Sequence, residues 1–131
     1  MKTSILFTTA RFNSTQAKEN FINDRCFGED LFVWLVQMLR DDGFAFDEPF
    51  QEDWGWAAIA KANGETLYMS GGIMDESIGA SPAQWMVSVE KVKKFGIFGP
   101  TDSALRSKVD ARVESILREQ PDVTAVARVE M

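Results

Sequence analysis

The dipeptide Asn63-Gly64 constrains the fold more than any other feature of the sequence. It separates two largely apolar runs, residues 54–62 and 65–70, each of a length typical of a β-strand. A type I′ turn needs a positive φ at both central residues, and Asn followed by Gly meets that need at little steric cost. The sequence therefore predicts a β-hairpin, with two antiparallel strands, in the middle of the chain.

Three further segments are predicted as strands. Residues 3–12 and 83–92 alternate between apolar and polar side chains, which is the pattern of a strand with one buried face. Residues 123–129 follow Pro121 and are predicted as the last strand. Residues 44–53 are predicted as a linker that leads into the hairpin.

Two segments have the three- and four-residue spacing of an amphipathic helix. The first runs from Gly28 to Arg40 and ends before Gly43. The second runs from a predicted N-cap at Thr101 to about Glu119. Their apolar stripes consist of Leu31, Trp34, Leu35, Met38 and Leu39, and of Leu105, Val109, Val113, Ile116 and Leu117.

The resulting element order is β-α-β-β-β-α-β. Because each helix has one apolar stripe, we expect both helices on one face of a single sheet. The predicted fold class is α+β, a two-layer sandwich with a five-stranded, mainly antiparallel sheet and two helices on one face. A length of 131 residues is typical of one domain, so residues 1–131 are predicted to form a single domain.

Compartment and membrane association can be judged from apolar runs and cysteine usage. No stretch approaches the ~20 apolar residues of a membrane span, and the apolar run at Ile5 to Phe7 is too short for a signal peptide. The single cysteine, Cys26, cannot form an internal disulfide, which fits a reducing compartment. We expect a cytoplasmic protein that does not bind membranes.

Histidine is absent from the sequence. A Ser-His-Asp or Cys-His catalytic arrangement therefore cannot form within the chain, and one cysteine without histidine is not a zinc motif. Ser70-Gly71-Gly72 follows a predicted strand but lacks the spacing of a phosphate-binding loop. We therefore expect no catalytic residues, no metal site and no cofactor, in a protein that is not an enzyme.

The negative charge of the chain is concentrated in one segment. The chain has 20 acidic and 14 basic residues, a net charge of −6. Residues 41–56 contain no Lys or Arg and hold six acids, Asp41, Asp42, Asp47, Glu48, Glu52 and Asp53, which equal the whole excess. An acidic surface repels nucleic acids and attracts basic proteins, so we expect a basic protein partner and no nucleic acid.

Two of the four tryptophans, Trp54 and Trp56, follow these acids directly. If both belong to a strand, they lie on the same face, because side chains at i and i+2 point the same way. They either form an exposed binding site together with the acids, or at least one of them belongs to the core. The candidate binding residues are Glu48, Glu52, Asp53, Trp54 and Trp56.

The segment Glu52-Asp53-Trp54-Gly55-Trp56, preceded by an amphipathic helix and a Gly43-Phe44 step, resembles a family of small uncharacterised bacterial proteins. The resemblance covers residues 28–92, and it implies no activity and no site residues. Small acidic domains without catalytic residues are also similar to immunity proteins that neutralise bacterial toxins. That similarity is one of type and not of motif.

Three functions agree with these features. The first is a non-catalytic protein-interaction domain, immunity-like in type, that binds a basic partner through residues 41–56. The second is a small-ligand-binding domain with a pocket near the glycine-containing loop 71–82, and the third is an enzyme that uses carboxylates. Because helices cover only one face of the predicted sheet, we also expect a homodimer, formed through the other face or through an edge strand.

Overall fold

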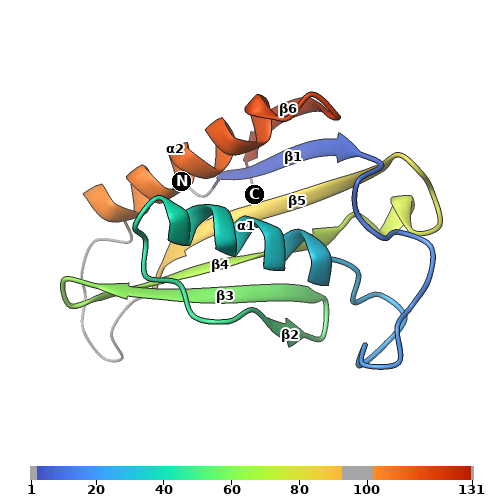
Figure 1. Cartoon of the computed structure of the whole chain (residues 1–131), viewed down its shortest axis with the longest axis horizontal. Coiled ribbons are helices and arrows are strands. Elements are labelled where there is room, and N and C mark those ends of the chain that lie inside the picture. Colours follow the sequence, from blue (N-terminus) through green and yellow to red (C-terminus); the bar gives the residue numbers. More distant parts are fainter. Residues whose placement is uncertain (1–2, 93–101, 131) are drawn as a thin grey trace.

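The computed structural model describes residues 3–92 and 102–130 and shows two helices packed on one sheet (Figure 1). The strands are β1 (Thr3–Thr9), β2 (Phe50–Glu52), β3 (Gly55–Ala62), β4 (Glu65–Ile73), β5 (Ala83–Lys91) and β6 (Val123–Glu130). The helices are α1 (Glu29–Asp41) and α2 (Ala104–Glu119), and a 3₁₀ turn, η1, spans Asp75–Ser77. The sheet has six strands in the order β2-β3-β4-β5-β1-β6, and all neighbouring strands are antiparallel.

The α+β class and the element order of the predicted strands and helices are confirmed, but the sheet has six strands and not five. The additional strand is β2, which lies within the segment predicted as a linker. It pairs with β3 through Phe50 opposite Ala57 and Glu52 opposite Gly55. A strand of three residues directly after Pro49 is too short to show an alternating pattern, so the sequence contains no signal for it.

The central hairpin forms as predicted. Asn63 has φ 52° and Gly64 has φ 77°, which are the two positive angles that a type I′ turn requires. Strand β4 continues through Gly71 and Gly72 to Ile73, so the predicted loop 71–82 begins later than expected. Glycine is needed in this strand, because a Cβ on Gly71 would lie 2.0 Å from the carbonyl oxygen of Met86.

Both helices lie on the same face of the sheet and contact each other (Figure 1). Helix α1 packs over β3, and α2 packs over β5 and β6. The expected N-cap of α2, Thr101, lies outside the described residues; the hydroxyl of Ser103 caps the helix by accepting from the N–H of Arg106. The core between helices and sheet includes Phe7, Leu35, Trp85, Val87 and Val113, all buried.

No helix of residues 3–92 and 102–130 lies on the other face of the sheet (Figure 1). Side chains of β5 alternate, so that Trp85, Val87 and Val89 point into the core while Met86 and Glu90 lie half-buried on the opposite face. The hydroxyls of Ser4 and Ser88 are hydrogen-bonded to each other on that face. We call it the uncovered face.

Candidate functional site

Strands β2 and β3 are joined by a two-residue turn, Asp53-Trp54, at the end of the sheet where α1 begins (Figure 1). Trp54 is 51% exposed, although it is among the largest apolar side chains of the protein. Asp53 beside it is also exposed. The turn thus presents a large aromatic side chain and a carboxylate to solvent.

Residues 20–26 pack alongside this turn and are held there by side-chain hydrogen bonds. The amide nitrogen Nδ2 of Asn23 donates to the carbonyl oxygen of Asp53 at 2.7 Å. Gln51 accepts from the N–H of Ile22 at 2.9 Å and donates to the carbonyl of Asn20 at 2.6 Å. These bonds fix the loop to β2 and to the turn.

Ile22 of this loop is a second exposed apolar side chain, at 57%, and its backbone N–H is the group bonded to Gln51 of β2. Asp24 in the same loop is exposed as well. We call the exposed side chains of Ile22, Asp24, Asp53 and Trp54 the hairpin-loop surface. Ile22 and Asp24 were not among the residues predicted from the sequence, because only the long-range bonds to β2 and the turn place them here.

Trp56, by contrast, lies in the core and is 5% exposed. Its indole nitrogen Nε1 donates a hydrogen bond of 2.7 Å to the carbonyl oxygen of Cys26, and its ring contacts Phe21. The expectation that Trp54 and Trp56 share one face is wrong, because the chain reverses at Asp53-Trp54 and only Trp56 belongs to β3. The alternative that at least one of the two is a core residue is confirmed.

The acids of residues 41–56 do not lie together. Asp41 and Asp42 lie at the C-terminal end of α1, whereas the turn lies near the beginning of that helix (Figure 1). Asp42 pairs with Arg112 of α2, and Glu48 pairs with Arg40 at 3.2 Å although its own side chain is 83% exposed. Of the predicted binding residues, the structure therefore brings together Asp53 and Trp54, with Glu52 next to them in β2.

Glu52 points to the uncovered face, where it lies near the hydroxyl of Tyr68 of β4. Burial, the negative charge of Glu52 and a hydrogen bond to its carboxylate raise the pKa of Tyr68 to about 12. Glu90, directly across from Tyr68 on β5, adds to this effect on the pKa. Tyr68 therefore stays protonated as a hydrogen-bond donor over the whole physiological pH range.

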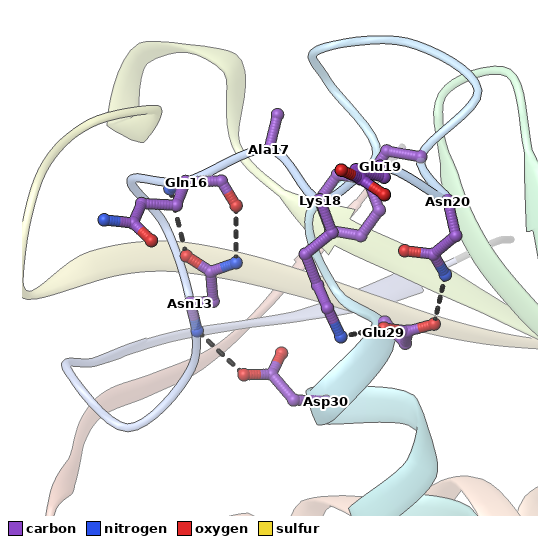
Figure 2. A pocket seen from close by; sticks show the side chains of 9 residues that line it. Asn13, Gln16, Ala17, Lys18, Glu19, Asn20, Glu29 and Asp30 are labelled. Carbon is purple, nitrogen blue, oxygen red and sulfur yellow. Dashed lines mark hydrogen bonds and ion pairs between the residues drawn. The ribbon is translucent and has the colours of Figure 1, made fainter.

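A pocket of about 700 Å³, lined mainly by polar residues, lies at the N-terminal end of α1, between that helix and residues 13–21 (Figure 2). Figure 2 shows Lys18 and Asn20 converging on Glu29, with distances of 2.6 Å and 2.7 Å to its two carboxylate oxygens. The ammonium group of Lys18 lowers the pKa of Glu29, and the carboxylate raises that of Lys18. The polar groups of this pocket thus bind one another.

This is not the ligand pocket that was expected near loop 71–82, because no residue of that loop lines it. The loop is hydrogen-bonded to the beginning of the 13–21 segment: the N–H of Gly79 donates to the carbonyl of Ser14, and the Ser14 hydroxyl donates to the carbonyl of Ala80. Cys26 is fully buried, and its Sγ contacts the carbonyl oxygen of Glu52 at 3.3 Å.

Within residues 3–92 and 102–130, no group of three or more Cys, Asp or Glu side chains could hold a metal ion. No helix in this part of the chain is long and apolar enough to cross a membrane. In the comparisons with known proteins, no family model, no curated protein and no solved structure matches the chain.

Proposed function

We propose that the chain is a non-catalytic protein-interaction domain that binds a basic partner through the hairpin-loop surface. The observation that carries the proposal is the exposure of Trp54 at 51% on a turn that is held in place by side-chain hydrogen bonds. A large apolar side chain at the surface is costly in water, and it gives a partner a site to bury. Tryptophan is also enriched among residues that contribute most to binding energy.

The hairpin-loop surface is better suited to binding than a flexible loop, because it is already fixed before a partner binds. The turn and residues 20–26 are bonded to each other through Asn23, Gln51 and Cys26, so little conformational entropy is lost when a partner binds. Ile22 and Trp54 are the exposed apolar side chains of this surface, and the three acids Asp24, Asp53 and the neighbouring Glu52 outnumber the one base of the same loop, exposed Arg25. Such charges steer a basic partner and raise the association rate.

A photo-crosslinking amino acid at position 54 tests the proposal in cells. A second variant with the same amino acid at Val33 is the matched control, because Val33 is 56% exposed and apolar but lies on α1. A protein captured from position 54 and not from position 33 is then purified, and its affinity is measured for Trp54→Ala and Val33→Ala. We expect Trp54→Ala to weaken binding by about 30-fold or more, equivalent to about 2 kcal/mol, and Val33→Ala to have no effect.

The charge contribution is tested with the triple variant Glu48→Gln, Glu52→Gln and Asp53→Asn. We expect slower association at low salt, and a difference from the wild type that shrinks as salt screens the charges. Equal effects of Trp54→Ala and Val33→Ala on affinity would remove the hairpin-loop surface as the binding site. An unchanged association rate of the triple variant at low salt would show that these acids are only solvated.

A further inference from the structure

Asn63 differs from the other three asparagines of the chain in the contacts of its side chain. The side-chain amides of Asn13, Asn20 and Asn23 each donate a hydrogen bond of 2.7 Å to an oxygen atom elsewhere in the chain. Asn63 is exposed, and its amide makes no hydrogen bond within residues 3–92 and 102–130. Of the four asparagines, only Asn63 is followed by a glycine.

Gly64 places an unhindered backbone nitrogen next to this amide. In the part of the chain that the structure describes, the N–H of Gly64 donates no hydrogen bond, and the residue lies between β3 and β4 and belongs to neither strand. A Cβ built on Gly64 would have no atom within 4 Å, so there is open space around the turn. Glycine also has the greatest backbone freedom of all residues. The nitrogen of Gly64 can therefore reach the side-chain carbon of Asn63 while β3 and β4 stay paired up to Ala62 and Glu65.

We propose that Asn63 is a site of spontaneous deamidation in the folded protein. The nitrogen of Gly64 gives its proton to the solvent and forms a bond to Cγ of Asn63, while the side-chain nitrogen takes up a proton and leaves as ammonia. The product is a succinimide ring, which water opens at either of its carbonyl carbons. The net reaction consumes water and releases ammonia. Asparagine is a chemically labile residue, and at Asn63 neither hydrogen bonds nor burial protect it.

The two ways of opening the ring give products with different main chains. Opening at Cγ gives an aspartate at position 63, and because Asp-Gly is also a preferred type I′ sequence, we expect this product to keep the hairpin. Opening at the backbone carbonyl carbon gives an isoaspartate, whose main chain runs through Cβ and Cγ and is longer by a carbon atom. The turn with φ 52° at Asn63 and 77° at Gly64 is then lost, and with it the alignment of Ala62 with Glu65.

The residue that follows the turn connects it to α2. The carboxylate of Glu65 accepts a hydrogen bond from the hydroxyl of Ser103, which is the N-cap of α2 and in turn accepts from the N–H of Arg106. An isoaspartate at position 63 therefore disturbs both the hairpin and the start of α2, whereas an aspartate changes mainly the charge. This proposal is independent of partner binding, because Asn63 does not belong to the hairpin-loop surface.

Incubation of the purified full chain, followed by digestion with trypsin and mass spectrometry, tests the proposal. Trypsin releases Asn63 in the peptide of residues 62–91, and the other asparagines in the peptides of residues 12–18 and 19–25. We expect the mass increase of an NH2-to-OH exchange in the first peptide and not in the other two, and fragmentation should assign it to residue 63. The rate should rise with pH, because the attacking nitrogen has to lose its proton.

Gly64→Ala should slow the reaction at least several-fold, because a methyl group hinders the nitrogen of residue 64. Gly43→Ala is the matched control, since Gly43 also has a positive φ and open space around it, and it should leave the rate unchanged. Far-ultraviolet circular dichroism establishes that both variants are folded. Asn63→Asp represents the aspartate product and should melt close to the wild type, whereas the isoaspartate form, separated by chromatography, should melt at a lower temperature.

A folded chain that keeps Asn63 intact, while the urea-denatured chain deamidates there, would overturn the proposal, because the hairpin then protects the amide. Equal rates at Asn63 and at the three hydrogen-bonded asparagines would also overturn it, and so would an unchanged rate in folded Gly64→Ala. An isoaspartate form that melts with the wild type would refute the expected effect on the hairpin and on α2.

Discussion

The indole nitrogen of Trp56 donates a 2.7 Å hydrogen bond to the carbonyl oxygen of Cys26, which lies 30 residues earlier in the chain. The bond connects β3 to the segment just before α1, where Gly28 has a φ of +136°, a conformation that favours glycine. The same segment contacts Glu52 and Asp53 through Cys26 and Asn23. Buried Trp56 thus helps to hold the loop that borders exposed Trp54.

Replacing Trp56 by Phe tests this support. Phe keeps an aromatic ring but cannot donate the bond, and it leaves a buried carbonyl unsatisfied, so we expect a loss of about 1–3 kcal/mol in the free energy of unfolding. Trp54→Phe is the matched control and should change stability by less than ~0.5 kcal/mol, because Trp54 is exposed. Urea denaturation measures both. Equal stabilities of the two variants would show that the Trp56 bond contributes nothing.

The parts of the fold that sequence patterns predict are those determined by local chemistry. Asn63-Gly64 specifies its turn because the required φ angles depend on those two residues alone. The apolar stripes of α1 and α2 likewise depend on spacing within one helix. For these elements the tertiary structure agrees with the local preference.

The hairpin-loop surface could be predicted only in part, because long-range contacts determine it. The turn at Asp53-Trp54 falls where the predicted linker meets the predicted strand, and although Asp is common in turns, Trp is not. Ile22 and Asp24 are placed by bonds between segments about 30 residues apart, such as Asn23 to Asp53. No local signal in the irregular stretch 13–27 indicates these partners.

Tyr68 provides a direct probe of the uncovered face, because it is the single tyrosine of the chain. Its pKa of about 12 in the folded state lies above the value of about 10 expected for an unfolded chain. Below pH ~10 both states hold the proton. As the pH rises from about 10 to 12, the unfolded state releases the Tyr68 proton while the folded state still holds it. Ionisation therefore stabilises the unfolded state, and the free energy of unfolding falls over that range.

The ultraviolet absorbance of the tyrosinate reports this titration. Glu52→Gln should lower the midpoint for Tyr68, since it removes a negative charge that opposes ionisation, but burial should keep the midpoint above the unfolded value. Glu48→Gln removes an equal charge that is paired with Arg40, and it should leave the midpoint unchanged. Identical midpoints for the wild type and Glu52→Gln would contradict the contact between Glu52 and Tyr68.

Gly71 is predicted to tolerate no side chain. A Cβ at this position would lie 2.0 Å from the Met86 carbonyl oxygen and 3.0 Å from Val87 Cα, so Gly71→Ala has to separate β4 from β5. We expect a loss of about 3 kcal/mol or more in stability. Gly43→Ala is the control, because Gly43 has φ +93° and open space around it, and backbone strain alone costs about 1–2 kcal/mol. Thermal unfolding that ranks Gly71→Ala as the more stable of the two would refute this account.

Asp110 is the buried carboxylate that joins α2 to the sheet. Its side chain is 8% exposed, and its Oδ2 lies 2.8 Å from Arg128 of β6 and 3.5 Å from Arg106 one turn earlier in the helix. Arg106 also donates to the carbonyl oxygen of Val89 of β5. Removing the carboxylate takes away the counter-ion that the two guanidinium groups share, while Arg106 keeps its ion pair with Asp102 and Arg128 its pair with Glu114. Breaking a fully buried pair, which leaves one charge without a partner, costs about 3–5 kcal/mol.

Asp110→Ala is therefore expected to destabilise the protein by about 2–4 kcal/mol, somewhat less than a fully buried pair, because the Arg128 side chain is 32% exposed. The control is Asp122→Ala, which removes a 2.6 Å ion pair with Arg11 whose carboxylate side chain is 48% exposed. Exposed pairs contribute about 0–1 kcal/mol, so this variant should stay close to the wild type. Asp110→Asn keeps an acceptor oxygen for Arg128 and should fall between the two, as measured by urea denaturation at constant ionic strength. An Asp110→Ala protein as stable as Asp122→Ala would mean that the ion pairs of Asp110 contribute no more to stability than an exposed pair.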